Sequence, residues 1–194
     1  MLSMLQILTN TYSTFQLKSS HRKIELDLGC GKGGFLLSIA AKYPSRLVIG
    51  ADVMLGRLRK VSRKASRRNL LNVLLLRVNA WDLIGYQLPD HCIHRVHILC
   101  PDPWPKSRHR CKRLITSEFL GRLSTKIVPG GILHLSTDDS PYLSFMKDAI
   151  TELGYYESNK EGLDDVKELK TDFEIKFEKE KKAVKHLLYR SLPS

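Results

Sequence analysis

Short apolar runs alternate with stretches of helical periodicity along most of the chain, and this alternation constrains the fold more than any other feature. Apolar runs predict strands at 23–29, 46–52, 72–78, 95–100 and 132–137, and apolar residues at helical spacing predict helices at 34–43, 54–69, 117–128 and 141–154. Strands this apolar must be covered on both faces, as in βαβ units with parallel strands. The sequence therefore predicts an α/β fold with a doubly wound, mostly parallel sheet and helices on both faces.

The chain is expected to form one domain over residues 1–194. Its 194 residues, 42% of them hydrophobic, can bury one substantial core, and no internal repeat or low-complexity linker divides them. A short N-terminal segment, 1–22, precedes the first predicted strand. The C-terminal segment, 157–194, is polar and rich in both charges up to residue 180, and an apolar run at 183–190 predicts a final edge strand. A turn is expected at the Pro-Gly-Gly sequence, 129–131.

Positive charge dominates the chain and favours a polyanionic partner. The 32 Lys and Arg residues exceed the 20 Asp and Glu residues by 12, which suits RNA, DNA or an anionic membrane surface through charge attraction and counterion release. Two stretches without any acid, 54–68 and 103–117, hold much of this charge. Their cations are Arg57, Arg59, Lys60, Arg63, Lys64, Arg67 and Arg68, and Lys106, Arg108, Arg110, Lys112 and Arg113. A solvated charged face is the alternative, but an unneutralised surface of this size favours a bound polyanion.

Neither a membrane span nor a metal site is expected. No apolar run reaches the roughly 18–20 residues that cross a bilayer, and the N-terminus lacks the basic start of a secretory signal, which favours a cytoplasmic protein. The four cysteines form no Cys-x-x-Cys pair and are expected to be reduced packing residues. A cluster of zinc-ligand types occurs at His91, Cys92, His94, His97 and Cys100, but neighbours along a strand point to opposite faces.

A glycine-rich loop at 29–34 joins the first predicted strand to the first helix, where open α/β sheets bind ligands. Its spacing fits both G-x-G-x-x-G, typical of dinucleotide sites, and G-x-G-x-G, formed by Gly29, Gly31 and Gly33; a simple helix-entry turn is a third interpretation. Asp27 precedes the loop, which suits a ligand with an ammonium group and is unfavourable beside a pyrophosphate. Asp52 ends the second strand and is suited to accept from ribose hydroxyls in either case. The loop therefore favours S-adenosylmethionine.

The pattern D-x-G-x-G-x-G, with an acid closing the second strand and a Pro-Gly-Gly turn before a late strand, resembles the class I methyltransferases, which have a Rossmann-like fold. The resemblance implies that Asp27 and the glycine loop hold the methionine part of S-adenosylmethionine and that Asp52 holds the ribose. It implies an adenine contact from Asn79, which follows the third strand.

The stretch PDPWPKSRHRCKRL, 101–114, carries the most specific signal. Pro101 and Pro103 fix the backbone on both sides of Asp102, which indicates a rigidly held carboxylate, or else a turn that merely ends the strand. Together with LSTDDSPY at 135–142 and TDFEIKFE at 171–178, it closely resembles the bacterial tRNA (guanine-N7-)-methyltransferases, which methylate guanine 46 in the variable loop of tRNA. The resemblance implies cofactor contacts from Asp27, Asp52, Asn79 and Asp102, and substrate contacts from Lys106, Asp138, Thr171, Asp172, Phe173 and Glu174.

The expected reaction needs no general base, because guanine N7 carries a lone pair and no proton. Asp102 is predicted to be the catalytic residue, since a fixed carboxylate stabilises positive charge that develops on the base. Three alternatives remain open: a nicotinamide-dependent oxidoreductase, a non-catalytic RNA-binding relative, and a methyltransferase that acts on another RNA or on DNA. The sequence indicates no obligate protein partner.

Overall fold

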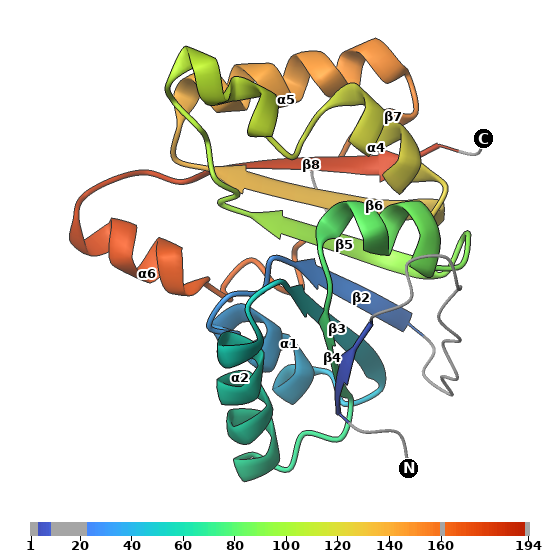
Figure 1. The fold of residues 1–194 in the computed structure, drawn as a ribbon, viewed down its shortest axis with the longest axis vertical. Coiled ribbons are helices and arrows are strands. Elements are labelled where there is room, and N and C mark those ends of the chain that lie inside the picture. The colour runs from blue at the N-terminus through green and yellow to red at the C-terminus, as the bar shows by residue number, and fades with distance from the viewer. Residues whose placement is uncertain (1–3, 9–22, 160–161, 193–194) are drawn as a thin grey trace.

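The computed structural model describes residues 4–8, 23–159 and 162–192, which form one mixed sheet with helices on both faces (Figure 1). The strands are β1 (Leu5–Ile7), β2 (Lys23–Leu28), β3 (Arg46–Asp52), β4 (Val73–Arg77), β5 (Ile93–Leu99), β6 (Ile127–Thr137), β7 (Tyr156–Ser158) and β8 (Lys185–Ser191). The helices are α1 (Gly34–Lys42), α2 (Leu55–Arg67), α3 (Ala80–Asp82), α4 (Ser117–Ser124), α5 (Ser140–Leu153) and α6 (Asp172–Lys179), with a π-helix at Leu83–Gln87 and a 3-10 helix at Ser107–Lys112.

The sheet has the order β1-β4-β3-β2-β5-β6-β8-β7. All pairs from β1 to β6 are parallel, and β8 and β7 add an antiparallel end. The chain leaves β2 to form β3 and β4 on one side and later returns to form β5 and β6 on the other. This change of direction beside β2 opens a crevice at the carboxyl ends of the strands. The prediction of a doubly wound, mostly parallel sheet is confirmed.

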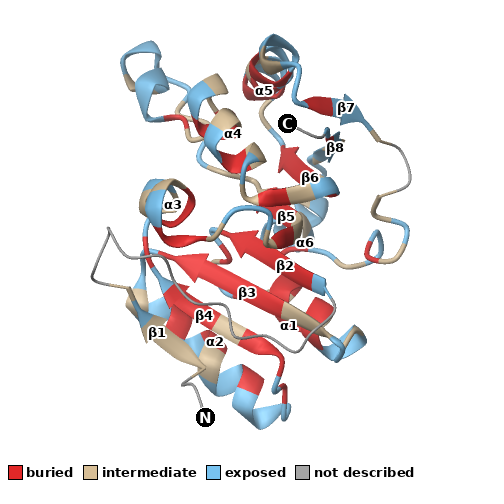
Figure 2. Cartoon of the chain, turned by 90° about the vertical axis from the view of Figure 1, so that its right-hand side faces the viewer, coloured by how far each residue is buried: buried red, intermediate tan, exposed pale blue. Residues whose placement is uncertain are grey.

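Apolar side chains bury both faces of the sheet, and Figure 2 shows β2 and β3 buried along most of their length. One core cluster packs α1 and α2 against the sheet, and the other includes buried residues of α4 and α5. In α2 the buried residues are Leu58, Val61 and Ala65, whose spacing leaves the basic residues on the outer face. Burying each large apolar side chain contributes about 1.5–3 kcal/mol, so the two layers together hold the sheet.

Helix α5 illustrates how local signals set the boundaries of an element. The side chain of Asp139 accepts a hydrogen bond from the N–H of Tyr142 at 2.7 Å, and Pro141 occupies the first turn, where no N–H is needed. Gly154 ends the helix in the left-handed conformation, with φ of 65°. These signals flank an apolar face that includes Met146 and Ile150, so the predicted helix forms close to its expected limits.

The helix predicted at 117–128 is too long, and the turn predicted at 129–131 is wrong. Helix α4 ends at Ser124, and β6 begins at Ile127 and includes the Pro-Gly-Gly sequence. Ile127 pairs with Ile93, and the register then shifts, which makes the glycines a bulge within the strand. A Cβ on Gly131 would lie 2.5 Å from the Ile127 side chain, so this bulge requires glycine.

The strand predicted at 183–190 forms as β8, but it is not at the edge of the sheet. It lies between β6 and β7, and the edges are β7 and β1. Strand β1 falls within 1–22, where no strand was expected, and the rest of that segment beyond residues 4–8 lies outside the described residues. Helix α6 lies in the charged C-terminal segment and was also missed. None of the helices among the described residues combines the length and apolarity needed to cross a membrane.

Candidate active site

Two adjoining cavities lie at the carboxyl ends of the central strands. The first, of about 280 Å³, lies between the glycine loop and the start of α6, and the second, of about 400 Å³, lies between Asp52 and the stretch 98–104. They share Gly29, Arg57, Leu99 and Phe173 and form one cleft. A larger depression of about 540 Å³ lies at α4 and the end of α5 and contains none of the predicted site residues. The cleft is therefore the candidate active site.

The glycine loop forms the floor of the cleft. Gly29, Gly31 and Gly33 have φ of 83°, 54° and 74°, a region that residues with a Cβ rarely adopt. The N–H of Gly29 donates to the carbonyl of Ala51 at 2.8 Å, which joins the loop to the end of β3. A Cβ on Gly33 would come within 2.7 Å of Val61 on α2. The loop therefore needs glycine both for its conformation and for its packing.

Asp27 is a buried acid that lines the first cavity. It is 5% exposed, and within the described part of the chain no hydrogen bond or ion pair satisfies its carboxylate. Burial, followed by the nearby charges of Asp52 and Asp172, raises the pKa of Asp27 to about 7. A cation in the cavity would relieve this cost. The site therefore fits the ammonium group of an amino acid, as in the methionine part of S-adenosylmethionine.

Asp52 holds the loop as well as lining the second cavity. Its Oδ2 accepts from the N–H of Gly31 at 3.1 Å, and its Oδ1 accepts from the N–H of Met54 at 2.7 Å. Arg57 approaches the same carboxylate at 3.8 Å. Carboxylate oxygens have further lone pairs, so Asp52 retains acceptor capacity toward the cavity. This bracing of the loop was not evident from the sequence.

Asn79 does not line either cavity, although its neighbours Val78 and Ala80 line the second. Its side chain caps α3 by accepting from the N–H of Asp82 at 2.8 Å, and its amide also bonds the Asp82 carboxylate. The side chain is exposed. The adenine contact of Asn79 therefore stays a prediction, and it requires the amide to leave the cap or to use a free lone pair.

Asp102 is exposed at the edge of the second cavity, on a strained stretch of backbone. Cys100 and Trp104 flank it with φ of 50° and 45°, which costs on the order of 1–3 kcal/mol for each residue. Arg113 holds this stretch: its Nε donates to the carbonyl of Pro103 at 2.8 Å, and its guanidinium lies 4.8 Å from the Tyr142 ring. Because Arg113 is only 5% exposed, its assignment to a charged surface is wrong.

Lys106 and Asp138 line neither cavity. Both are exposed, and Lys106 precedes the 3-10 helix at Ser107–Lys112. Burial, and then the charges of Glu174 and Asp138, raise the pKa of Cys100 to about 11. The two carboxylates therefore lie close to the end of β5, beside the stretch that carries Asp102.

The segment 171–174 closes one side of the cleft. Thr171 and Glu174 form a capping box, in which the Thr171 Oγ1 accepts from the Glu174 N–H at 3.0 Å and the Glu174 carboxylate accepts from the Thr171 N–H at 2.6 Å. Asp172 Oδ2 accepts from the N–H of Gly34 at 3.2 Å. Phe173 is 52% exposed and lines both cavities. Substrate contacts from these residues remain predictions.

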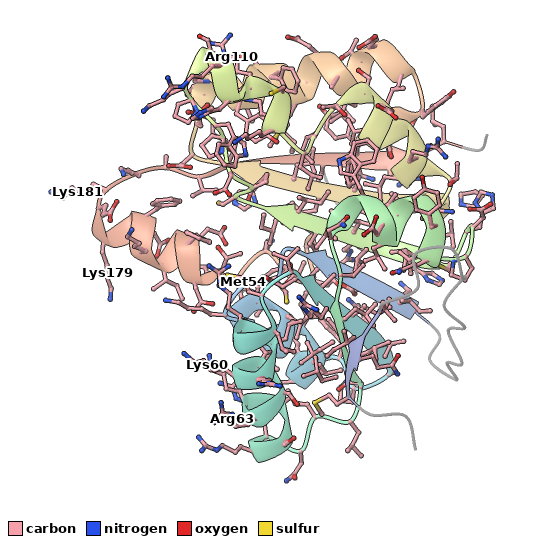
Figure 3. The ribbon with its side chains drawn as sticks, in the orientation of Figure 1. Met54, Lys60, Arg63, Arg110, Lys179 and Lys181 are labelled. Atoms are coloured by element: carbon pink, nitrogen blue, oxygen red, sulfur yellow. The ribbon has the colours of Figure 1, made fainter. Side chains whose placement is uncertain are left out.

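Several exposed cations project from one side of the molecule (Figure 3). Figure 3 shows Lys60 and Arg63 projecting outward from α2, Lys179 and Lys181 projecting from α6 and the residues after it, and Arg110 lying above them on the same side. In α2 the Arg63 Nε donates to the carbonyl of Arg59 at 3.4 Å, and no carboxylate neutralises that guanidinium among the described residues. The arrangement gives a basic surface on this side that is suited to phosphates.

The candidate zinc ligands have separate partners. His91 Nδ1 contacts the Ile127 carbonyl, His94 Nδ1 accepts from the Ile24 N–H, and His97 contacts Glu25. Within residues 4–8, 23–159 and 162–192, no three His, Cys, Asp or Glu side chains are placed to hold a metal ion. The four cysteines, Cys30, Cys92, Cys100 and Cys111, are free thiols.

A parallel sheet whose glycine loop and strand-end acids face one cleft defines a class I methyltransferase with the Rossmann-like fold. The family described as "Putative methyltransferase" matches residues 21–187. The tRNA (guanine-N(7)-)-methyltransferase of Chlorobium phaeobacteroides is 36% identical over 70% of this chain and 67% of its own, and that of Halorhodospira halophila is 38% identical over 64% and 54%. The chain belongs to the tRNA (guanine-N7-)-methyltransferase family.

The chain spans about half to two thirds of the length of these relatives. Among solved structures, that of the 16S rRNA methyltransferase KamB is similar, with a TM-score of 0.67, 21% identity and coverage of 91% of both chains. That likeness supports the fold.

Proposed function

We propose that the protein transfers the methyl group of S-adenosylmethionine to N7 of a guanine in tRNA, at position 46 of the variable loop. The observation that carries the proposal is the uncompensated acid Asp27 on the wall of a cleft whose far side is edged by Asp102. The names of the curated relatives support the choice of tRNA and of guanine N7.

Asp27 and Asp52 would bind two polar parts of the cofactor, the methionine part and the ribose. Asp27 would pair with the ammonium of the methionine part, which offsets the cost of burying its own charge. Asp52, already fixed by the N–H groups of Gly31 and Met54, would accept from the ribose hydroxyls. When bound, S-adenosylmethionine supplies a methyl group on a positively charged sulfur.

Asp102 would act on charge rather than on a proton. Guanine N7 attacks through a lone pair, so alignment should supply much of the rate, and alignment of two reactants recovers about 7–11 kcal/mol of barrier. Positive charge reaches the base as the methyl group moves. A carboxylate held between Pro101 and Pro103 stabilises that charge most in the transition state.

The exposed cations and the residues that contact the base would have different roles. The basic residues of α2 and of the stretch 106–112 would bind phosphates, which fixes the RNA without reading its sequence. Phe173, half exposed over both cavities, is placed to stack on a nucleotide base. Asp138 and Glu174 lie close to the end of β5 and would accept from the guanine N1 and amino hydrogens, which adenine does not offer together.

Mass mapping of tRNA tests the proposal. Unmodified tRNA would be incubated with the protein and S-adenosylmethionine, digested, and mapped for the methylated nucleoside, with tRNA carrying adenosine at position 46 as the control. N7-methylguanosine at position 46, absent from the control, is the expected result. Methylation at another nucleoside, or of ribosomal RNA alone in a parallel reaction, would contradict it.

A further inference from the structure

A continuous line of hydrogen bonds crosses the sheet beneath the cleft and ends on α6. His97 Nε2 lies 3.1 Å from Glu25 Oε2, and His97 Nδ1 lies 3.0 Å from His134 Nδ1. His134 Nε2 lies 2.8 Å from His186 Nδ1, and His186 Nε2 lies 3.0 Å from Glu174 Oε1. These five residues, termed the histidine chain, join β2, β5, β6 and β8 to the first turn of α6.

Most of the histidine chain is excluded from water. Glu25, His97 and His134 are 1%, 0% and 3% exposed, whereas the side chain of His186 is 36% exposed. The rings are fixed by packing as well as by hydrogen bonds, because Phe35 meets His97 edge-on with ring centroids 4.9 Å apart. The His186 and His134 rings lie end to end, with centroids 5.1 Å apart and planes inclined by 25°. Each of the three histidines uses both of its ring nitrogens, so turning any ring would break two of these hydrogen bonds.

The histidine chain needs four protons for its hydrogen bonds, whereas three neutral imidazole rings carry only three. Each of its four hydrogen bonds needs one proton, and an ionised carboxylate supplies none. If Glu25 accepts from His97 Nε2, then His97 Nδ1 must accept from His134, and His134 Nε2 must accept from His186. In a neutral His186 the Nε2 atom would then carry a lone pair and no proton, and it could not bond to the Glu174 carboxylate. A fourth proton is therefore required between these two groups.

The environment assigns that fourth proton to His186. Burial alone would raise the pKa of Glu25, but His97, Arg95 and Arg46 lower it to about 2. Burial also opposes ionisation of Glu174, yet hydrogen bonds from His186 and Thr171 keep its pKa below the ordinary value. Burial lowers the pKa of His97 and of His134, so neither interior ring takes the charge.

Charged groups at the two ends leave this assignment intact. At the Glu25 end, Arg46 and Arg95 both approach Glu25 and Asp165, so two cations balance two carboxylates. At the other end, the Cys100 thiol lies close to both Glu174 and Asp138. Burial and these two carboxylates raise the pKa of Cys100, which keeps its thiol neutral.

We propose that His186 is a positioning residue, which as an imidazolium anchors Glu174 and thereby fixes the start of α6 over the cleft. Glu174 closes the capping box of α6, and the same first turn places Asp172 on Gly34 and Phe173 over both cavities. Removing the bond from His186 frees this turn. The inference rests on the proposed function only in taking the cleft as the site of S-adenosylmethionine.

Nitrogen NMR of the histidine rings tests the protonation pattern in the wild-type protein, with no cofactor or tRNA present. At pH 7 the expected pattern is an imidazolium at His186, a proton on Nε2 of His97 and a proton on Nδ1 of His134. Three neutral rings at pH 7, or the charge on His97 or His134, would overturn the proposal. This measurement does not depend on any variant folding.

Variants of His186 test the positioning role. Trypsin cleavage after Lys176 and Lys179 reports opening of α6, and calorimetry reports affinity for S-adenosylmethionine. For His186→Leu we expect about tenfold faster cleavage and about tenfold weaker binding, as for removal of one charge-assisted hydrogen bond. His186→Gln keeps a donor to Glu174 and should recover part of both.

Arg190→Gln is the matched control, because Arg190 lies on the same strand and pairs with Glu157 at 3.9 Å, away from α6. It should leave cleavage and affinity within twofold of wild type. A His186→Leu protein that also stays within twofold would overturn the positioning role. If cleavage depends on His186 while tRNA receives no methyl group, the positioning role stands and the proposed tRNA activity fails.

Discussion

Asp172 Oδ2 accepts a hydrogen bond from the backbone N–H of Gly34 at 3.2 Å, so the C-terminal segment lies directly on the start of α1. A Cβ on Gly34 would approach the same oxygen at 2.9 Å, so a larger residue at position 34 would displace the Asp172 carboxylate. The carboxylate meets the positive end of the α1 dipole, which favours it. The same charge lies near Asp27 and opposes ionisation there. One contact thus joins α6, the glycine loop and the buried acid.

Asp172→Asn should lower the pKa of Asp27 below about 7, because it removes a like charge and keeps an oxygen that accepts from Gly34. Carbon NMR of the Asp27 carboxyl, titrated without cofactor, measures the change. Asp164→Asn is the control, since Asp164 is exposed and pairs with Lys167. An unchanged pKa in Asp172→Asn would show that the two acids do not interact.

Asp27→Asn should stabilise the cofactor-free protein at pH 7.5 and weaken its affinity for S-adenosylmethionine. A carboxyl whose folded pKa is about 7 binds a proton that the unfolded chain has already released, so wild-type stability falls as pH rises from about 4 to 7. The gain should be a few kcal/mol, on the order of the 1.36 kcal/mol per pKa unit that linkage requires. Urea unfolding at pH 4 and pH 7.5 measures it. Parallel pH profiles for the two proteins would contradict the burial of a charged Asp27.

Asp52→Ala should weaken cofactor binding tenfold or more, because it removes acceptors worth about 1.5–3 kcal/mol each and releases the N–H groups of Gly31 and Met54. Asp52→Asn keeps one side-chain oxygen and should lose less. Calorimetry with S-adenosylmethionine gives both affinities. Unchanged affinity in the alanine variant would mean that the acid does not reach the ligand.

Asp102→Ala should reduce the single-turnover rate of methyl transfer, at saturating cofactor and tRNA, about a hundredfold to a thousandfold. The reduction should greatly exceed any loss of tRNA affinity, because the carboxylate acts chiefly on charge in the transition state. Asp102→Asn should lie between the alanine variant and wild type. A saturated rate within a few-fold of wild type would leave the stretch around Asp102 as a rigid turn only.

Reversing Arg63 and Arg67 to Glu should flatten the dependence of tRNA affinity on salt by about one unit of slope for each phosphate that the protein no longer neutralises. Cofactor affinity should stay unchanged. Arg122→Glu with Lys147→Glu is the matched control, because these cations lie on α4 and α5. Equal slopes in both double variants would place the RNA on another surface.

A strand that is buried on both faces needs a continuous run of apolar residues, and the central strands were predicted from such runs. Strand β1 has only three residues and none of them is buried, so it shows no apolar run that would have predicted it. The Pro-Gly-Gly bulge in β6 resembles a turn because both need the same residues. Helix α6 has no buried residue, so no core-facing periodicity marks it in the sequence, although its Thr171 and Glu174 spacing was a visible capping signal.

In the site, too, the residues with a local sequence signal were predicted and the contacts between distant segments were not. The glycine loop, Asp27 and Asp52 were predicted from local order along the chain, and the structure brings them to one cleft with Asp102, Asp172 and Phe173. Arg113 was misassigned because a cation within a basic run gives no sign that aromatic rings cover it. The histidine chain depends on the pairing of four strands, and cross-strand neighbours cannot be read from spacing.

The position of β8 between β6 and β7 has a consequence for vectorial folding during synthesis. Within the part of the chain that the structure describes, strand β7 pairs only with β8, and α6 lies between them in the chain. Neither this edge of the sheet nor the α6 contact with His186 can therefore form before β8 has emerged. A nascent chain can therefore form its glycine loop before Asp172 on α6 reaches Gly34. Closure of the cleft by α6 is therefore expected to follow the arrival of β8.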